Sequence, residues 1–190
     1  MMLGSHNSWS YLKPLKWWMH LIRFTAKCQS HSIRKQYLED GVRCFDLRIK
    51  FINDILRIAH GKVVYKYSLS DLKEDLKWLN NQGDVWVRVI HEVRTEEEYT
   101  SRNKLHFTGF CSQVIEDYPN IHWWCGRNLF NWQYDYFFVE VPSCEEKYAS
   151  VCPSKLDDWW PWLYAVRKNH SILFKGTVKD ILLIDYVNIK

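Results

Sequence analysis

Two histidines in short motifs carry the clearest chemical signal in this sequence. The first is His6, within Gly4-Ser5-His6-Asn7-Ser8, and the second is His60, within the pair His60-Gly61. Each motif joins a strand-like run to a loop or a small residue, as at the carboxyl ends of the strands in a barrel enzyme. An imidazole accepts or donates a proton near neutral pH, so the pair could supply the base and the acid of one reaction.

A carboxylate and a guanidinium lie between the two histidines. They belong to the run Gly41-Val42-Arg43-Cys44-Phe45-Asp46-Leu47-Arg48, which reads as a strand. Alternate residues of a strand share a face, so Asp46 and Arg48 point the same way. An arginine can hold developing negative charge on a phosphate. Two imidazoles, a carboxylate and a guanidinium are together sufficient for in-line attack on a phosphodiester.

The order of these motifs resembles the X region of the phosphatidylinositol-specific phospholipases C. In that family a His-Asn or His-Asp pair ends the first strand, a Gly-x-Arg-x-(Phe/Val)-(Asp/Glu)-(Leu/Ile)-(Arg/Asp) run forms the second, and a His-Gly pair follows. A fourth strand ends in an acidic residue, here Glu92 in Val85–Glu92. The resemblance covers about residues 2–92. Gly-Ser-His is also typical of expression-vector linkers, but those normally precede the native methionine, whereas this one follows Met1-Met2-Leu3.

The resemblance implies a barrel enzyme that cleaves a phosphoinositide by internal attack. The inositol 2-hydroxyl attacks the neighbouring phosphorus, which gives a cyclic phosphate and releases diacylglycerol. His6 would be the general base, and His60 the general acid that protonates the glycerol oxygen. Arg48 would hold the developing negative charge, and Asp46 would orient a histidine or fix Arg48. A purely structural ion pair is an equally good interpretation of Asp46.

Four further residues are expected to contact the substrate. Asn7 follows the first histidine, and Asp185 on the last expected strand could reach His6 if the barrel closes there. Glu92 shares its strand face with Arg88. Glu92 therefore either accepts a sugar hydroxyl or simply neutralises Arg88 inside the barrel.

The resemblance also bears on metal dependence. Calcium-dependent members use an Asn, a Glu, an Asp and a further Glu as ligands, whereas metal-independent bacterial members place an arginine at one of these positions. Asn7, Asp46 and Glu92 match three oxygen-bearing positions, and Arg48 occupies the fourth. We therefore predict no required metal or other cofactor, because a guanidinium repels a divalent cation. The alternatives are a Ca²⁺-dependent enzyme of this fold, or a non-catalytic phosphoinositide- or phosphate-binding module.

Length and composition fit one domain over residues 1–190. Hydrophobic residues make up 47% and charged residues 25% of the chain, as in ordinary globular proteins. A complete eight-fold barrel usually needs about 200–250 residues or more. The fold class is therefore predicted to be α/β, as a compact, distorted or incomplete TIM-type (β/α) barrel.

Net charge and hydrophobic patterning limit which binding partners can be expected. A net charge of +4 is too small to indicate nucleic acid, and no apolar run approaches the ~20 residues of a membrane span. We expect a phosphoinositide or related phosphodiester as substrate, with transient contact at a membrane surface. The location is expected to be cytoplasmic if the chain is complete, and secreted if a signal peptide was removed.

Strands and helices are expected to alternate along most of the chain. Helices are expected at 15–27, at 32–39, at 71–79 with Ser70 as N-cap, and from a capping box at Thr95–Glu98 towards Pro119, and 143–169 is expected to be partly helical. Strands are expected at 42–49, 56–60, 63–67, 85–93, 121–125, 134–141 and 181–187.

Cysteines and tryptophans leave two further questions open. Cys144 and Cys152 could form a disulfide in an oxidising compartment, whereas His122 and Cys125 are better explained as core residues than as metal ligands. Most of the 11 tryptophans are expected to fill the core. Trp17-Trp18 or Trp159–Trp162 could instead lie at a rim and enter a lipid interface.

Overall fold

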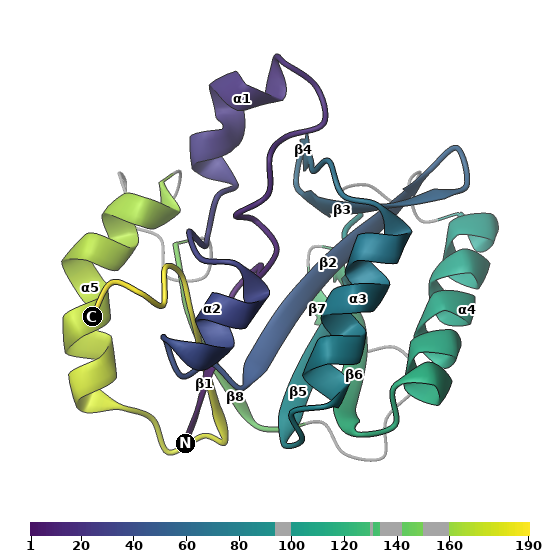
Figure 1. Ribbon diagram of the computed structural model, residues 1–190. Helices are drawn as coiled ribbons and strands as arrows, with labels where there is room; N and C mark the ends of the chain where they lie inside the picture. The colour runs from purple at the N-terminus through teal and green to yellow at the C-terminus, as the bar shows by residue number, and fades with distance from the viewer. Residues whose placement is uncertain (94–99, 130, 134–141, 150–159) are drawn as a thin grey trace.

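Six parallel strands form the centre of one curled sheet in the computed structural model, which describes residues 1–93, 100–129, 131–133, 142–149 and 160–190 (Figure 1). Their order across the sheet is β6-β5-β2-β1-β9-β8. The strands are β1 (Met2–Ser5), β2 (Cys44–Ile52), β5 (Val85–His91), β6 (Ile121–Leu129), β8 (Cys144–Lys147) and β9 (Ile181–Ile184). Within the described ranges no ladder joins β8 back to β6, so the predicted α/β fold with a distorted, incomplete barrel is confirmed.

Antiparallel strands extend this sheet in two places. β7 (Asn131–Gln133) pairs with the end of β6. β3 (Ile55–His60) folds back on β2 and pairs in turn with β4 (Val63–Val64). The β2–β3 connection consists of Asn53 and Asp54, both with positive φ, as a two-residue hairpin turn requires. This hairpin carries His60 back towards the parallel strands.

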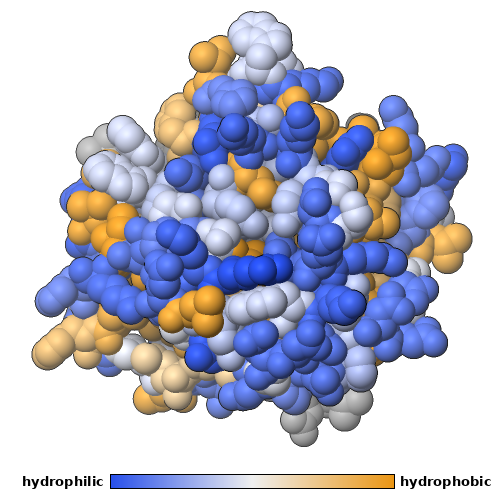
Figure 2. Space-filling view, viewed as in Figure 1, coloured by the Kyte–Doolittle hydropathy of each residue, from blue (hydrophilic) through white to orange (hydrophobic). Residues whose placement is uncertain are grey.

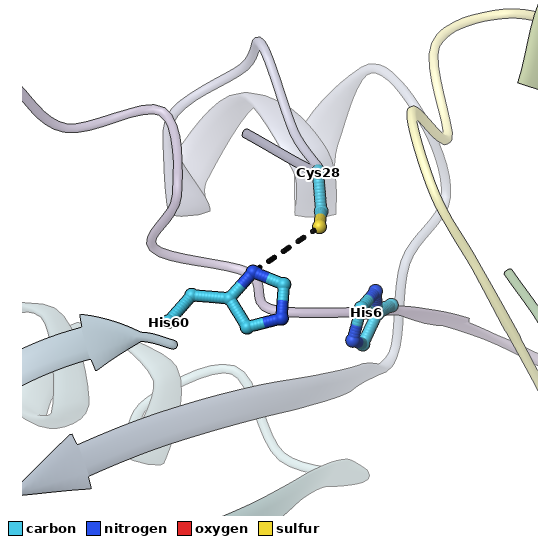
Figure 3. Close-up of side chains that lie close together, drawn as sticks. All are labelled: His6, Cys28 and His60. Carbon is cyan, nitrogen blue, oxygen red and sulfur yellow. Dashed lines mark hydrogen bonds between the residues drawn. The ribbon is translucent and has the colours of Figure 1, made fainter. Parts of the chain in front are cut away.

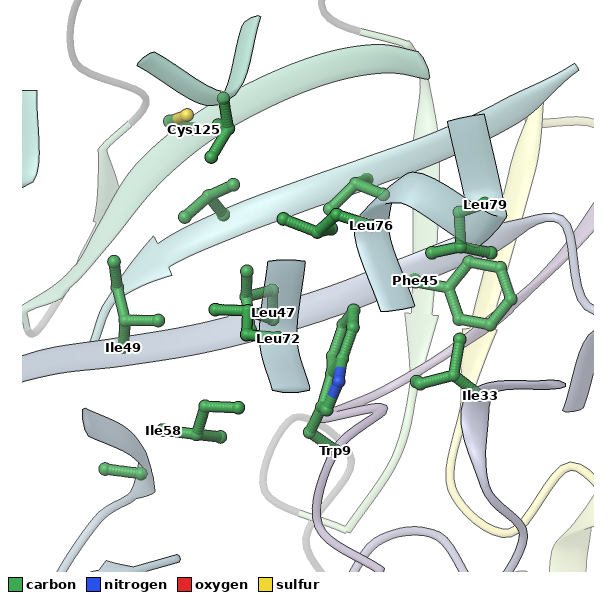
Figure 4. Packing of buried hydrophobic residues seen from close by; sticks show 14 of the residues in the cluster. Trp9, Ile33, Phe45, Leu47, Ile49, Ile58, Leu72, Leu76, Leu79 and Cys125 are labelled. Atoms are coloured by element: carbon green, nitrogen blue, oxygen red, sulfur yellow. The ribbon is translucent and has the colours of Figure 1, made fainter. Parts of the chain in front are cut away.

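The convex face of the sheet packs against helices. Phe45, Leu47 and Ile49 alternate along β2 and belong to the large buried core. They pack with Trp9 and with a stripe on α3 (Leu69–Asn80) formed by Leu72, Leu76 and Leu79, a spacing that puts all three on one helix face (Figure 4). Burying side chains of this size contributes about 1.5–3 kcal/mol each.

The concave face has a smaller core of its own. Cys44, Trp124, Tyr148, Ile181 and Leu183 form a second buried cluster, drawn from β2, β6, β9 and the end of β8. Strands at opposite ends of the sheet order meet in this cluster, so the sheet must curl around it. The two faces of β2 therefore have different surroundings. Phe45, Leu47 and Ile49 pack against the helices, whereas the residues that alternate with them point inside the curl.

The remaining helices lie in front of the sheet, at its left and right edges and above it (Figure 1). α2 (Ile33–Leu38) lies in front with α3, α4 (Ser101–Asp117) lies at the right and α5 (Pro161–Lys175) lies at the left. The short α1 (Met19–Ile22) continues into the 3₁₀ turn η1 (Arg23–Thr25) at the top, beyond the carboxyl ends of the parallel strands. None of the helices in the described ranges is long and apolar enough to span a bilayer.

Several expectations about the elements need correction. Ser68, not Ser70, caps α3, because Asp71 is the residue three positions on that completes the capping box. The expected helix over 15–27 contains only the two short turns α1 and η1. Residues 144–147, expected within a partly helical segment, form β8, because they pair in register with β9.

Other expectations fall wholly or partly outside the described residues. The capping box at Thr95–Glu98 and the strand at 134–141 lie there, as do Cys152 and Trp159. The helix that runs towards Pro119 is present as α4, and its N-cap is Thr100, whose Oγ1 accepts a hydrogen bond from the Asn103 backbone N–H at 3.1 Å. Cys144 carries a free thiol.

Candidate active site

Polar side chains collect where the parallel strands end. His6 follows β1, Glu92 follows β5, Tyr148 follows β8 and Asp185 follows β9. Carboxyl ends of parallel strands meet at one edge of a sheet, which is where such folds place their ligands. The structure brings all eight predicted residues into one connected cluster at this edge: His6, Asn7, Asp46, Arg48, His60, Arg88, Glu92 and Asp185.

His6 is held by Asp185, and its other nitrogen, Nε2, lies 4.0 Å from Asp46 Oδ2 without a hydrogen bond. Its Nδ1 lies 2.6 Å from Asp185 Oδ1, and Nε2 has no hydrogen-bond partner in the described part of the chain. Burial lowers the pKa of His6 well below its usual value, and the positive charge of Arg48 lowers it further. A neutral imidazole that donates from Nδ1 has its lone pair on Nε2. His6 is thus set up to accept a proton at Nε2.

Asp185 is shaped by the same burial. Its side chain is fully buried, and removal from water raises its pKa to about 7. Besides the contact with His6, it accepts a hydrogen bond from the Ala149 backbone N–H at 3.2 Å. Asn7 and Tyr186 both have a left-handed backbone conformation, with φ 45°, in the turns that follow β1 and β9. The chain therefore bends sharply directly after His6 and directly after Asp185, which fixes the positions of both side chains.

His60 faces His6 from the β3 hairpin. The ring centroids are 5.4 Å apart and the ring planes meet at 86°. His60 Nδ1 donates to the Ala26 carbonyl oxygen at 3.0 Å, and that oxygen also accepts from the Tyr65 hydroxyl at 3.0 Å. Burial lowers the pKa of His60, and Arg48 lowers it further. The ring orientation is thereby fixed through Nδ1.

A cavity opens beside His60. It measures about 360 Å³, within the range of small-molecule sites. Its lining residues come from the α1–η1 segment and the β3–β4 hairpin: Ile22, Thr25, Ala26, His60, Gly61, Lys62 and Val63. His6 is 1% exposed, so His60 is the member of the pair that borders open space.

Asp46 organises the guanidinium groups. Its Oδ2 accepts from Arg48 Nε at 2.8 Å and from the Asn7 backbone N–H at 2.8 Å. Its Oδ1 accepts from Arg88 Nε at 2.9 Å. Burial alone would raise the pKa of Asp46, but Arg48 and Arg88 hold it well below its usual range. Asp46 is therefore an ionised anchor that fixes both arginines.

Glu92 links the arginine to the histidine hairpin. Glu92 Oε2 accepts from Arg48 Nη1 at 3.3 Å, and Glu92 Oε1 accepts from the Gly61 backbone N–H at 2.8 Å. Arg48 consequently lies between two carboxylates, Asp46 and Glu92, both at most 2% exposed. Through Gly61, the same contacts fix the position of His60.

These contacts disagree with the expectations for a calcium site. Calcium would need the carboxylate oxygens of Asp46 and Glu92 as ligands, but these oxygens already accept hydrogen bonds from N–H groups. The Arg48 guanidinium also lies between the two carboxylates. The Asn7 side chain donates from Nδ2 to the Ala26 carbonyl at 3.3 Å, which leaves its Oδ1 as the one side-chain oxygen of these three residues without a hydrogen bond within the described segments. Calcium takes six to eight oxygen ligands around one point, and these residues do not offer that arrangement.

Tyr148 and Cys28 are part of the site but were missed from the sequence. Tyr148 stacks on His6 with ring centroids 3.6 Å apart and planes at 3°, and its hydroxyl donates to Glu146 Oε2 at 3.0 Å. Glu146 in turn contacts Arg88 Nη1. Cys28 Sγ lies 3.8 Å from His60 Nδ1. The position of Tyr148 after a strand would have been a usable signal, had β8 been recognised as a strand.

Two residues weighed earlier as metal ligands do not join this cluster. Cys125 is buried in the large core, as expected. His122 is exposed and stacks on Trp86 with centroids 4.6 Å apart, so its expected place in the core is wrong. His122 is the second residue of β6 and lies near the start of that strand, away from the carboxyl ends where the site residues collect.

Comparison with known proteins supports the fold. The structure is similar to a phosphatidylinositol-specific phospholipase C from Listeria monocytogenes, with a TM-score of 0.60 and 18% sequence identity. The match covers 97% of this chain and 87% of the bacterial one. No family model matches the sequence, and no curated protein matches it. At this level of identity the likeness extends to the phospholipase C-like barrel architecture alone.

Proposed function

We propose that this chain is a phospholipase C-like phosphodiesterase that cleaves a phosphoinositide or a related phosphodiester by attack of a hydroxyl group within the substrate. The observation that carries the proposal is the meeting of His6 and His60, 5.4 Å apart between ring centroids, beside the Arg48 guanidinium and the cavity at His60. Proton acceptor, proton donor and anion-binding group are thus supplied in one place.

In the attack step, His6 is the general base. Its Nε2 takes the proton of the attacking hydroxyl while that oxygen forms a bond to phosphorus. The His6 pKa, lowered by burial, keeps the ring neutral and ready to accept. Asp185 holds Nδ1 and stabilises the imidazolium that forms. Such a transfer contributes about 10²–10⁴ in rate.

In the same step, His60 is the general acid for the leaving group. The bond between phosphorus and the glycerol oxygen breaks, and His60 donates a proton to that oxygen. Burial and Arg48 lower the pKa of His60 in the free site, so the anionic phosphodiester must raise it when it binds. The products are a cyclic phosphate and diacylglycerol.

Arg48 is proposed to stabilise the charge on the non-bridging phosphate oxygens. Asp46 and Glu92 fix its guanidinium from two sides, so little reorganisation accompanies the reaction. Arg88 and Asn7 are then positioning residues, because both hold Asp46. No divalent cation is needed in this scheme, because the guanidinium supplies the positive charge.

We further propose that the substrate is taken from a membrane surface. Trp17 is 79% and Leu21 is 70% exposed on the segment at α1, and Phe24 in η1 meets Trp160 with ring centroids 5.9 Å apart. Figure 2 shows pale and orange side chains mixed with blue ones over this upper end of the molecule. Indole rings are stable at the boundary of a bilayer. The segment also lines the cavity at His60, so a headgroup could enter there.

The proposal is tested by turnover of phosphatidylinositol in vesicles. Wild-type protein should release a water-soluble inositol phosphate, and His6→Ala and His60→Ala should each lower the rate by about 10²–10⁴. His170→Ala, at an exposed position of α5, is the matched control and should keep the wild-type rate. Vesicle binding without turnover would favour the non-catalytic module instead. Unchanged turnover in both site variants would refute the assignment.

A further inference from the structure

We propose that His6, Cys28 and His60 form a binding site for a thiophilic divalent cation such as Zn²⁺, and that the bound ion inhibits the enzyme. The inhibitory part rests on the proposed function, because it requires that both histidines transfer protons. Binding itself does not depend on any activity. Such a site differs from the oxygen-ligand calcium site discussed above, both in its residues and in its chemistry.

The geometry of three donors carries this proposal. One nitrogen from each histidine and the Cys28 sulfur lie within 4.8 Å of one another. Figure 3 shows Cys28 above the His60 ring, with the His6 ring edge-on beside them. Zinc bonds of about 2.0–2.3 Å in a tetrahedral site put ligand atoms roughly 3.5 Å apart. A closing movement of about 1 Å among the side chains would therefore suffice.

An independent observation concerns His6. The residue is 1% exposed, and its Nε2 has no hydrogen-bond partner among the residues that the structure describes. Buried ring nitrogens normally have a partner. Nδ1 is engaged by Asp185, which is the carboxylate–histidine arrangement that orients metal-bound imidazoles in general. An ion at Nε2 would satisfy the remaining nitrogen.

The ligand set selects the kind of cation. Thiolate and imidazole favour Zn²⁺ over Ca²⁺ or Mg²⁺. Three carboxyl groups, from Asp46, Glu92 and Asp185, surround the site together with the Arg48 and Arg88 guanidinium groups, so positive charge does not dominate. On binding, the metal–sulfur bond replaces the S–H bond of Cys28, and the proton passes to the buffer. Three protein ligands leave a fourth position for water or a substrate oxygen.

Inhibition follows from the same bonds. A cation that occupies the lone pairs of both imidazoles prevents His6 from accepting a proton and His60 from carrying one. Chelation of trace zinc should then raise activity, whereas a calcium-dependent enzyme would lose it. The two kinds of metal effect have opposite signs.

Direct binding is measured by titrating the full chain with Co²⁺ as a spectroscopic probe and then displacing it with Zn²⁺. We expect one equivalent to bind and to give the near-ultraviolet absorption of a thiolate–cobalt bond. Cys28→Ser should abolish that absorption, and both Cys28→Ser and His60→Ala should weaken Zn²⁺ binding by about 100-fold or more. Cys144→Ser, a free thiol outside the cluster, is the control and should keep the absorption. Circular dichroism verifies that each variant is folded.

Three results would overturn the proposal or its inhibitory part. Wild-type protein that binds no Co²⁺ or Zn²⁺ would refute the site, as would a folded Cys28→Ser variant with unchanged affinity. Stoichiometric Zn²⁺ binding that leaves turnover unchanged or raises it would refute inhibition alone. A protein that binds the cation through Cys28 but never turns over phosphatidylinositol would support the metal site and contradict the proposed function, so the two failures are distinguishable.

Discussion

Replacing Asp185 with asparagine should weaken catalysis and, at alkaline pH, strengthen the fold. The side chain is fully buried and holds His6 Nδ1 at 2.6 Å. Asparagine has the same shape but lacks the charge that orients His6 and stabilises its imidazolium. We expect kcat for phosphatidylinositol cleavage to fall by about 10²–10⁴, which corresponds to about 3–5 kcal/mol of transition-state stabilisation.

The expected effect on stability has a defined sign and pH window. Burial raises the pKa of Asp185 from 3.8 to about 7, so the folded state holds this proton more tightly than the unfolded state. The stability that Asp185 contributes is fully present below about pH 4 and is lost as the pH rises to about 7. That loss amounts to about 4 kcal/mol for the wild type, and the Asp185→Asn variant does not suffer it.

Urea denaturation at several pH values measures this difference. The free energy of unfolding of the variant minus that of the wild type should increase by about 4 kcal/mol between pH 4 and pH 8. Asp180→Asn, at the exposed residue before β9, is the control, because that carboxylate accepts its hydrogen bonds from Ser143 and lies outside the cluster. It should leave kcat unchanged and show no gain towards pH 8. A pH-independent difference for Asp185→Asn, together with an unchanged kcat, would refute the reasoning.

Four other perturbations test the packing of the fold, the stacking of Tyr148 on His6 and the independence from calcium. Gly4→Ala should destabilise the protein by about 1–3 kcal/mol in thermal or urea unfolding, because a Cβ would lie 2.6 Å from Leu183 Cδ2. Gly109→Ala in α4, where a Cβ would meet nothing within 4 Å apart from the adjoining backbone of the helix, should instead stabilise by about 0.5–1 kcal/mol. Tyr148→Phe keeps the ring stacked on His6 and should retain kcat while losing about 1 kcal/mol of stability with its hydroxyl contact; a large loss of kcat would mean that the hydroxyl takes part in the reaction. In zinc-free buffer, turnover in EGTA should equal turnover in Ca²⁺, and activity abolished by EGTA and restored by Ca²⁺ would contradict the role given to Arg48.

Much of the candidate site could be predicted because its residues are placed by local rules. Strand alternation in β2 puts Asp46 and Arg48 on the face opposite Phe45 and Leu47, and the structure has them so. The His-Gly pair follows a recognisable hairpin strand. Asp185 could be named only on the condition that the last strand lies beside the first, which depends on pairing between distant segments.

Other parts of the site are set by tertiary contacts that leave no local signal. Cys-Glu-Glu-Lys at 144–147 has little strand propensity, and it forms β8 because β9 pairs with it. Missing β8 meant missing Tyr148. Cys28 lies in a loop after η1 without any periodic pattern, and its place near His60 comes from packing around the Ala26 carbonyl. The N-cap of α3 is also difficult to predict from the sequence, because Ser68 and Ser70 are both plausible caps. The capping box that Ser68 forms with Asp71 makes Ser68 the cap.

The most direct test of internal attack is ³¹P NMR of the product released from two substrates. One is phosphatidylinositol, and the other is its analogue with a methylated inositol 2-hydroxyl. With the first, the wild-type protein should produce a five-membered cyclic phosphate before any linear phosphomonoester, and it should leave the second uncleaved. Equal cleavage of both, or a linear phosphate as the first product, would contradict the central claim that His6 activates a hydroxyl group of the substrate itself.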